Sequence, residues 1–450
     1  MCGVFGAFDC PKAAEQTVLG LHTEQHRAKE YVGIVTSDGA NLFRETGPGI
    51  TQEVFRDEKT LDQLHGRSSI GHIRYSTVED DQRLDNTQPI IGSFGSQEVA
   101  IAHNGQINNC AELREGLGPF KTSMDTEVIL KLFCASSAED VFERVFDAVR
   151  FLKGTYCLIF LYNDVMIAVR DPWGNRPLSL GSREDSWFVS SETIVFDVLG
   201  IETVRDIEPG EILVITKDDI SSRYFDEERL SKEPIPHARA MCIFEELYYA
   251  HPGSVMFGEP VVDFRLRAGR KLCQLCPSPG RTVVGVPDSA LFHGDGFAQE
   301  QGSGDSAVRG LLRSHYVGRT FVEALQKIRE ASVARKFAPV CKLLLGKAVT
   351  LVEDSIVRLT TLPGVNRLVR RAGAVEVHGR VSSPPITHPC IYGIDTPIPE
   401  ELAASKWSVE EIRQRSGLDS LEFMPMEGLR SLVPNPDDYC YACMNGKYPI

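Results

Sequence analysis

The sequence lacks an excess of positive charge. Its 48 lysine and arginine residues are outnumbered by 62 aspartates and glutamates, so the formal net charge is −14 at pH 7. General binding to nucleic acid or to an anionic membrane surface is therefore not expected. The sequence also lacks an apolar run as long as a transmembrane helix, and residues 1–7 lack a basic leader. These absences predict a cytoplasmic protein that acts on small molecules.

Internal repeats and low-complexity segments are absent as well, which leaves an ordinary globular chain. With 450 residues, 42% of them hydrophobic, the chain is long enough for two or three domains with proper cores. Its 12 cysteines are not expected to form disulfides in a reducing compartment. We interpret them as nucleophiles, metal ligands or core residues.

The pattern of the chain changes near residue 230. Up to about Phe225 it consists of many short apolar strands, which predict an α+β layered unit. Residues 226–238 are rich in charge and proline, so we place a domain boundary there. Beyond it, helices expected at 265–276 and 320–334 alternate with strands expected at 282–286, 348–352 and 375–381. This alternation predicts a mainly parallel sheet with ligands at the carboxyl ends of its strands.

The first candidate catalytic group is Cys2. An initiator methionine is removed when a small residue follows it, so the mature chain could begin with a residue that carries both a thiol and a free α-amine. The pKa of an α-amine is about 8, low enough for it to accept the thiol proton without a histidine. Taken alone, Cys2 could equally be a small residue after the start codon.

Three polar clusters stand where predicted strands end. Arg74 supplies a fixed cation, Asn104 and Gly105 supply a side-chain amide and a backbone N–H, and Asp125 supplies a carboxylate. A cysteine that attacks glutamine needs a cation and an anion for the amino-acid end and neutral donors for the oxyanion. Taken singly, Arg74 could be a salt-bridge partner, Asn104-Gly105 a turn and Asp125 a helix cap. Together with Cys2, they favour glutamine chemistry.

Five segments carry a resemblance to a known family: Cys2-Gly-Val-Phe-Gly, Gln25-His-Arg27, Gly71-His-Ile-Arg74-Tyr-Ser-Thr, His103-Asn-Gly-Gln and Asp171-Pro-Trp-Gly-Asn-Arg-Pro. They resemble the glutaminase domain of the glutamine phosphoribosylpyrophosphate (PRPP) amidotransferases, or amidophosphoribosyltransferases. The resemblance implies an αββα sandwich of the N-terminal-nucleophile (Ntn) hydrolase class at residues 2–230. It also implies that Cys2 is the nucleophile, that Asn104 and Gly105 form the oxyanion hole, that Arg74 and Asp125 bind glutamine and that Arg27 lies beside the thiol. Tyr31 departs from the small residue expected in the pocket wall.

The same family carries a type I phosphoribosyltransferase domain, which the resemblance assigns to residues 231–450. A hydrophobic strand, an acidic pair, hydroxyl residues and a helix follow one another around residues 351–361, a pattern that suits ribose hydroxyls and a 5′-phosphate. A second loop after residue 286 matches the pyrophosphate loop. The residues implied to bind PRPP and Mg²⁺ are Asp288, Ser289, Arg319, Lys336, Glu353, Asp354, Ser355, Thr360 and Thr361.

Several residues of the second domain depart from the family pattern. Glu353 replaces an aspartate, Leu359 and Ala290 replace glycines, Leu362 replaces a serine, and His315 replaces a more basic residue. If the backbone at Leu359 is left-handed, leucine there costs about 1–2 kcal/mol relative to glycine. The departures cluster at one substrate, so we expect PRPP binding to be retained, while the sequence leaves efficient turnover of PRPP open.

The cysteines allow two metal sites. Cys440 and Cys443 form one Cys-x-x-Cys pair, and Cys273 and Cys276 form a second, so spacing alone could join them in a zinc site. The resemblance to iron–sulfur members of the family instead implies a [4Fe–4S] cluster held by Cys242, Cys390, Cys440 and Cys443. In that case Cys273 and Cys276 are partly buried apolar residues.

Three functions remain open from the sequence. The first is the purine-pathway reaction, in which ammonia from glutamine is channelled to PRPP to give 5-phosphoribosylamine, pyrophosphate and glutamate. The second is a paralogue that supplies ammonia to a different acceptor in specialised metabolism. In the third, the second domain is a non-catalytic regulatory module. The family resemblance also implies a homodimer or homotetramer.

Overall fold

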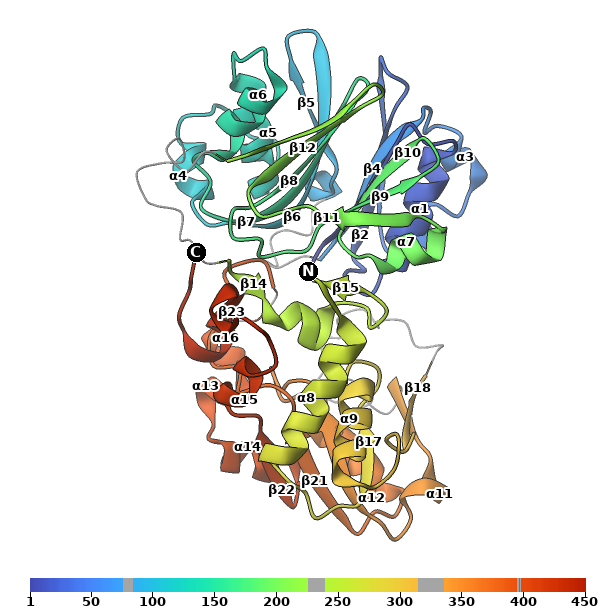
Figure 1. Cartoon of the computed structure of the whole chain (residues 1–450), viewed down its shortest axis with the longest axis vertical. Helices are drawn as coiled ribbons and strands as arrows, with labels where there is room; N and C mark the ends of the chain where they lie inside the picture. Colours follow the sequence, from blue (N-terminus) through green and yellow to red (C-terminus); the bar gives the residue numbers. More distant parts are fainter. Residues whose placement is uncertain (76–83, 226–238, 315–335, 395, 397) are drawn as a thin grey trace.

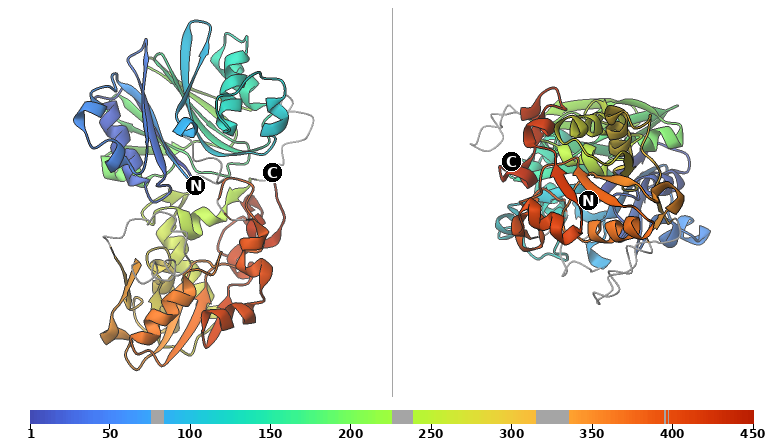
Figure 2. Two further views of the ribbon diagram at one scale, coloured as in Figure 1. Left: turned by 180° about the vertical axis from the view of Figure 1, so that it is seen from behind. Right: turned by 90° about the horizontal axis from the view of Figure 1, so that it is seen from below.

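The computed structural model describes residues 1–75, 84–225, 239–314, 336–394, 396 and 398–450. Figure 1 shows two parts, an upper one formed by the first half of the chain and a lower one formed by the second half. Both marked ends of the chain lie at the junction between these parts, as the left view of Figure 2 also shows. No helix among the described residues is long and apolar enough to cross a membrane.

The upper part is a sandwich of two antiparallel sheets. The strands of the first sheet are, in order across it, β11 (Glu202–Asp206), β9 (Ser179–Arg183), β10 (Ser186–Ser190), β1 (Gly3–Phe8), β4 (Ser68–Arg74), β2 (Tyr31–Ser37) and β3 (Leu42–Pro48). Those of the second sheet are β13 (Ile220–Tyr224), β12 (Glu211–Thr216), β8 (Val165–Arg170), β7 (Gly154–Tyr162), β6 (Gln97–Ile107) and β5 (Ile90–Phe94).

Helices cover the outer face of each sheet. The helix α1 (Ala13–Thr23) packs against β1 and β4, and α5 (Asp125–Ala135) with α6 (Val141–Val149) packs on the second sheet. A separate apolar core fills the space between the sheets. These layers are the αββα sandwich predicted from the sequence. Shorter helices at the surface are α2 (Thr51–Val54), α3 (Glu58–Leu61), η2 (Leu84–Asn86), α4 (Cys110–Arg114) and α7 (Ile194–Leu199).

Strand β1 is buried on both faces, and its alternation decides where its residues point. Val4 and Phe8 belong to the core between the sheets, whereas Phe5 and Ala7 belong to the core beneath α1. Side chains alternate between the two faces of a strand. The side chain of Cys2, two residues before Val4, is therefore directed toward the second sheet.

The lower part is built on a parallel sheet with the order β17 (Thr282–Gly285), β20 (Ala348–Glu353), β21 (Glu376–Val381) and β22 (Ser420–Phe423). Helices α8 (Val261–Leu275) and α9 (Leu291–Gln301) pack on one face, and α12 (Leu362–Arg371) and α14 (Val409–Ser416) pack on the other. The parallel sheet predicted from the alternating pattern is confirmed. Smaller elements are β14 (Met241–Cys242), η3 (Glu245–Tyr249), β15 (Val255–Met256), β16 (Glu259–Pro260), β18 (Leu311–Arg313), β19 (Phe337–Pro339), α11 (Cys341–Leu344), η4 (Pro399–Glu401), α13 (Ala403–Lys406), α15 (Met426–Arg430), η5 (Pro436–Asp438), β23 (Tyr439–Cys440) and α16 (Ala442–Asn445).

Two predictions fall outside the described residues. These are the domain boundary near residue 230 and the helix at 320–334. The predicted helix at 265–276 is present as α8, which begins four residues earlier, at Val261. Its extra first turn packs Val261 against Met256 and Ala250, contacts between distant residues that the periodic pattern does not encode.

The junction between the two parts is polar and buried. The Asp171-Pro-Trp-Gly-Asn-Arg-Pro segment lies there: the carbonyl oxygen of Trp173 accepts from the N–H of Ala240, and that of Asn175 accepts from the N–H of Cys242. Arg176 is fully buried, and its Nη1 lies 3.4 Å from Oε1 of Glu245. This segment therefore joins the sandwich to the first strand of the lower part.

Candidate active site

Cys2 lies at the junction, directly before β1. Its side chain is partly exposed, and its carbonyl oxygen accepts a hydrogen bond of 3.0 Å from Nε of Arg27. The Arg27 guanidinium is fully buried and also donates to Glu192 at 2.5 Å and to Glu245 at 2.9 Å. Burial alone lowers the pKa of Arg27, but the carboxylates of Glu245 and Glu192 raise it above its ordinary value. Arg27 therefore stays charged and fixes the backbone of Cys2.

Met1 precedes this thiol and is itself buried. Its Sδ lies 2.7 Å from Nη1 of Arg176. The α-amine of Cys2 is free only in a chain from which Met1 has been removed.

Arg74 is the last residue of β4 and is almost fully buried. In the sheet register it stands opposite Tyr31 of β2, while Ile73 stands opposite Gly3. Its guanidinium carbon lies 5.9 Å from the centre of the Tyr31 ring. Tyr31, the departure noted in the sequence, thus stacks near the cation predicted to hold a carboxylate.

Asn104 and Gly105 lie on β6, in the sheet that the Cys2 side chain faces. Asn104 is buried, and its Nδ2 has no hydrogen-bond partner among the described residues. A buried amide donor without a partner is costly, so its persistence suggests that a ligand completes it. Gly105 has to be glycine, because a Cβ there would lie 2.0 Å from the carbonyl oxygen of Thr155.

Asp125 begins α5 and is bound to the same strand. Its Oδ2 accepts from the N–H of Ile107 at 2.9 Å, and its Oδ1 lies 3.6 Å from Nδ1 of His103. Burial acts to raise the pKa of Asp125, but the His103 charge and these hydrogen bonds hold it below its usual value. The cap residue of α5 is Met124, so Asp125 does not act as the N-cap.

The predicted acidic pair and pyrophosphate loop meet at the carboxyl ends of two adjacent strands. Glu353 ends β20 and Asp354 follows it, while Ser289 follows β17. The Ser289 hydroxyl donates to Asp354 Oδ2 at 2.5 Å, and the Ser355 hydroxyl donates to Oδ1 at 2.6 Å. Asp288 forms an ion pair with Arg313. The two loops are thus joined through one carboxylate.

The carboxyl groups of Glu353 and Asp354 both have raised pKa values. Burial raises the pKa of Glu353 well above its usual range, the neighbouring Asp354 raises it further, and Lys336 opposes the shift. Burial also raises the pKa of Asp354, against the hydrogen bonds from Ser289 and Ser355. Two buried carboxylates side by side with little compensating charge suit a hard divalent cation such as Mg²⁺. Predicted ligand Arg319 and the substituted His315 lie outside the described residues.

Leu359 adopts a left-handed backbone conformation with φ of 56°. This is the conformation for which leucine is unfavourable and glycine is free of strain. Thr360 and Thr361 follow, and α12 begins at the next residue, Leu362. The Leu362 side chain is buried in the core beneath the sheet, so this departure adds packing and does not enter the loop.

The four cysteines predicted to hold a cluster gather at the junction. Cys242 of β14 and Cys440 of β23 stand opposite each other in a parallel strand pair. Burial raises the pKa of the Cys443 thiol well above its usual value, and the nearby thiols of Cys390, Cys242 and Cys440 raise it further. Sγ of Cys390 accepts a hydrogen bond of 3.3 Å from the N–H of Tyr392.

The other two cysteines of the alternative zinc set, Cys273 and Cys276, lie at the end of α8. The thiol of Cys276 donates to the carbonyl oxygen of Phe423 at 3.4 Å. Cys273 is buried, with charged neighbours that include Glu300 and Arg380. Within the described ranges, no group of three or more His, Cys, Asp or Glu has the compact arrangement that holds a single metal ion. A four-iron cluster is larger than one ion, so its thiolates stand further apart.

Comparison with known proteins decides the family. Residues 72–197 match the family described as a glutamine amidotransferase domain. The chain is 42% identical to the chloroplastic amidophosphoribosyltransferase of Glycine max, over all of this chain and 78% of that protein. It is 40% identical to amidophosphoribosyltransferase of Bacillus subtilis, over all of this chain and 94% of that protein. The chain belongs to the amidophosphoribosyltransferase family.

A solved structure of this family shares the whole architecture. Glutamine PRPP amidotransferase from B. subtilis, complexed with ADP and GMP, superposes with a TM-score of 0.90 at 39% identity. The match covers all of this chain and 97% of that one. The order of an Ntn glutaminase followed by a phosphoribosyltransferase domain, expected from the motifs, is confirmed by this agreement.

Two buried glutamates of this family member were not predicted. Oε1 of Glu24 accepts from the Ser190 hydroxyl at 2.8 Å and from the N–H of Glu192 at 3.0 Å, while its Oε2 has no partner in the described structure. Burial raises the pKa of Glu24 to about 8, against the charge of Arg27. Glu192, by contrast, has a pKa below its usual value, because His26 and Arg27 outweigh its burial. Only the nearness of Glu24 to Arg27 in the sequence could have suggested this network.

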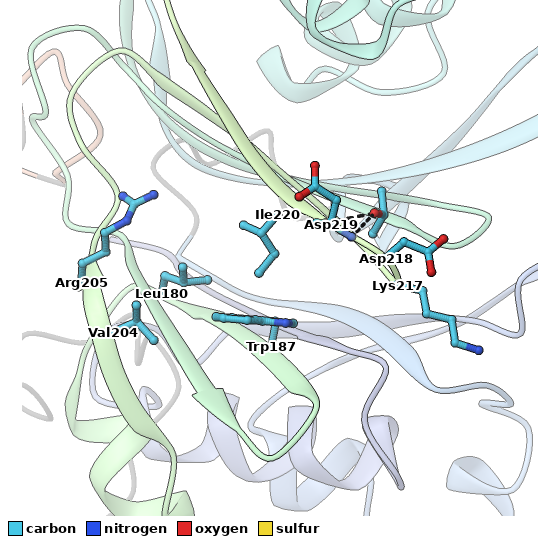
Figure 3. Close-up of a pocket in the computed structure, with 9 residues that line it drawn as sticks. Leu180, Trp187, Val204, Arg205, Lys217, Asp218, Asp219 and Ile220 are labelled. Atoms are coloured by element: carbon cyan, nitrogen blue, oxygen red, sulfur yellow. Dashed lines mark hydrogen bonds between the residues drawn. The ribbon is translucent and has the colours of Figure 1, made fainter.

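A cavity of about 470 Å³ lies elsewhere on the amidotransferase fold. Figure 3 shows Trp187, Arg205, Lys217 and Asp219 around it, at the edges of the two sheets. Trp187 stands opposite Phe8, the last residue of β1, whereas Cys2 precedes the first. The cavity is therefore at the far end of the sandwich from the thiol.

Proposed function

We propose that this protein catalyses glutamine-dependent amidotransfer to PRPP, the first step of purine biosynthesis, giving 5-phosphoribosylamine, pyrophosphate and glutamate. Membership of the amidophosphoribosyltransferase family over the full chain supports this function. The observation that carries the glutaminase half is the buried Nδ2 of Asn104, a donor that has no partner in the described part of the chain and lies on the sheet that faces Cys2. We also propose residues 2–230 as the glutaminase domain and 231–450 as the phosphoribosyltransferase domain.

In the glutaminase step, the α-amine of Cys2 takes the thiol proton and the sulfur attacks the glutamine amide carbon. Asn104 Nδ2 and the N–H of Gly105 stabilise the oxyanion of the tetrahedral intermediate. The α-ammonium of Cys2 returns its proton to the amide nitrogen, so that collapse of the intermediate releases ammonia and leaves a thioester. Water then attacks the thioester, which releases glutamate and restores the thiol. Arg74 pairs with the substrate carboxylate and Asp125, which stays ionised, pairs with the substrate ammonium.

In the second step, ammonia attacks C1 of PRPP and displaces pyrophosphate. Glu353 and Asp354 would hold the ribose hydroxyls and Mg²⁺, which neutralises the departing pyrophosphate when bound. The pyrophosphate itself would lie at the loop of Asp288 and Ser289. The 5′-phosphate would lie at Ser355, Thr360 and Thr361, before the first turn of α12. Lys336 and Arg319 would add positive charge.

The residues around the four gathered cysteines fit an iron–sulfur cluster. We propose that Cys242, Cys390, Cys440 and Cys443 hold a [4Fe–4S] cluster. The donor set is four thiols, Cys390 already accepts an N–H hydrogen bond, and the Arg176 guanidinium acts electrostatically on Cys242 and Cys390. The cluster would join the segment around Cys440 to the first strand of the second domain.

A Cys2→Ala variant tests the assignment. Glutamine-dependent formation of pyrophosphate and glutamate is expected to disappear, while synthesis with free ammonia is expected to continue at the wild-type rate. Arg67→Ala, a change at an exposed ion pair with Asp9, serves as the control and should leave both activities unchanged. Glutamine hydrolysis that survives in Cys2→Ala contradicts the proposed nucleophile.

A second function is favoured by the left-handed backbone of Leu359. In this alternative the PRPP chemistry is altered or lost, and the protein supplies ammonia to a different acceptor or acts as a glutaminase with a regulatory second domain. Pyrophosphate release from PRPP with ammonia separates the two, because only the amidotransferase produces it. Together with the amidotransferase function, we propose a cytoplasmic location and a homodimer or homotetramer.

A further inference from the structure

In the second part of the molecule, the main chain at Gly393 packs against Gly105 of the proposed oxyanion hole. Gly393 has a φ of 93°, and a Cβ built on it would lie 3.0 Å from the carbonyl oxygen of Gly105 and 3.1 Å from its carbonyl carbon. A Cβ contact this short requires the neighbour to move, and here the neighbour is backbone. The segment 392–393 therefore packs on Gly105 with no side chain between them.

The residue before Gly393 binds the strand next to Gly105. The carbonyl oxygen of Tyr392 accepts from the Thr155 hydroxyl at 3.0 Å and from Nη2 of Arg176 at 2.6 Å. Thr155 is also the residue whose carbonyl oxygen would meet a Cβ on Gly105. Thr155 thus contacts both the proposed oxyanion glycine and the segment that covers it.

Tyr392 is also bound by residues of the second part. It is fully buried, its N–H donates to Sγ of Cys390, and its hydroxyl pairs with both main-chain groups of Ile450 at 2.7 and 2.9 Å. A residue held by five hydrogen bonds to four other residues has little freedom to shift. It can therefore act as a fixed wall against which Gly105 is placed.

We infer that Tyr392 and Gly393 of the second part position the Gly105 N–H in the oxyanion hole of the first part. They are positioning residues, since they touch Gly105 and its neighbour Thr155 and not the substrate. The inference rests on the proposed glutaminase function. Oxyanion donors act only when held at hydrogen-bond distance from the developing charge, and a misplacement of about 1 Å costs about 100-fold in rate. Glutamine hydrolysis is thus tied to the correct docking of the second part.

The test is Gly393→Ala, with Gly258→Ala as the matched control. Gly258 has a similar φ of 87°, and a Cβ there has no heavy atom within 4 Å, so the control carries the backbone strain without the contact. For Gly393→Ala, kcat for glutamine hydrolysis is expected to fall about 10- to 100-fold with KM for glutamine nearly unchanged. Gly258→Ala is expected to keep the wild-type kcat.

Two further readouts separate positioning from general damage. The Cys2 thiolate adds to the aldehyde carbon of glutamate γ-semialdehyde and places an oxyanion in the hole. The affinity of the protein for this aldehyde should therefore fall by the same factor as kcat. Alkylation of Cys2 by iodoacetamide displaces iodide without forming an oxyanion, so its rate should not change. Equal losses in alkylation and in aldehyde affinity overturn the inference, and so does a folded Gly393→Ala with unchanged kcat.

A second variant keeps the inference testable if Gly393→Ala does not fold. Thr155→Val keeps the side-chain shape but removes the hydroxyl that donates to Tyr392, and kcat should fall several-fold with alkylation unchanged. An unchanged kcat and aldehyde affinity in a folded Thr155→Val overturn the inference in that case. Failure of the proposed function gives a different result, because wild-type protein would then hydrolyse no glutamine, or would hydrolyse it without Cys2.

Discussion

The guanidinium of Arg27 joins the two parts of the molecule, because its Nη2 lies 2.9 Å from Oε1 of Glu245, at the start of the second part. The same guanidinium reaches Glu192 and the carbonyl oxygen of Cys2. All three charged side chains are fully buried. The positive charge of Arg27 therefore compensates the negative charges of the two buried glutamates.

Replacing Arg27 by Met is expected to lower the free energy of unfolding by about 3–5 kcal/mol, since two buried carboxylates would each lose one of their partners. Arg67→Ala, which breaks the exposed pair with Asp9, is expected to cost less than about 1 kcal/mol. Urea unfolding of both variants at pH 7.5 measures the difference. Equal costs for the two arginines would contradict the role given to Arg27.

Leu359 offers a test of backbone strain in the phosphate loop. Asparagine tolerates a left-handed backbone, whereas a β-branched residue does not. Leu359 is partly buried against the core of the second part, so Leu359→Asn relieves backbone strain but loses some packing, and its free energy of unfolding should stay within about 1 kcal/mol of wild type. Leu359→Val adds strain and should lower the free energy of unfolding. Leu345 is exposed and has a φ of −59°, so Leu345→Asn removes a leucine without relieving strain and serves as the control.

The same loop variants should change substrate binding. We expect Leu359→Gly and Leu359→Asn to lower KM for PRPP in the ammonia-dependent assay, because the left-handed turn that precedes Thr360 and Thr361 is then unstrained. A KM that rises in both variants would indicate that the leucine side chain contributes to binding.

Glu24 should make stability depend on pH. Burial raises its pKa from about 4.5 to about 8 in the folded state, so between these values the folded protein binds more protons than the unfolded chain. Its stabilising contribution is full below about pH 4.5 and is lost as the pH rises through about 8. The slope is at most about 1.4 kcal/mol per pH unit.

Glu24→Gln removes this titration and keeps an oxygen for the Ser190 hydroxyl and the N–H of Glu192. Relative to wild type, the variant should gain at least about 1 kcal/mol of stability between pH 5 and pH 8. The difference is the useful quantity, because Glu246 also has a pKa of about 8 and titrates in the same window. Glu115→Gln, at an exposed position, should follow wild type at every pH. A constant difference across this range would mean that Glu24 is ionised in the folded protein.

The cluster assignment predicts which cysteines matter. Cys242→Ser and Cys440→Ser are expected to lose bound iron, sulfide and the brown absorbance of a [4Fe–4S] cluster. Cys273→Ser and Cys276→Ser should keep all three, because these residues lie in the core at the end of α8. Metal analysis that finds zinc, dependent on Cys273 and Cys276, would support the alternative set instead.

The parts of the site that depend on local chemistry could be proposed from the sequence. Cys2, Arg74, Asn104 and Asp125 could be proposed because their side chains match the demands of one reaction, although Asn104 lies within β6 and Asp125 begins α5. The strain expected from a left-handed backbone at Leu359 could be considered from the sequence, and Leu359 adopts this backbone conformation in the structure.

Contacts between distant segments could not be predicted from the sequence. The packing of Gly393 on Gly105 and the pairing of Tyr392 with Thr155 join residues of opposite halves of the chain, and no periodic pattern encodes such pairs. The raised pKa of Glu24 follows from burial, which appears only when α1 packs on β1. The clustering of departures at the PRPP site led us to treat Leu362 as a disturbed loop residue, yet its side chain belongs to the core.

The pairing of Cys242 with Cys440 has a consequence for biosynthesis. These residues form a two-stranded parallel ladder although most of the second part lies between them in the sequence. A ladder between such distant segments closes late, because the entropy of the intervening chain opposes it. The ribosome must release Cys443 before all four thiols can meet. If these thiols hold the proposed cluster, iron delivery would follow translation of the second part.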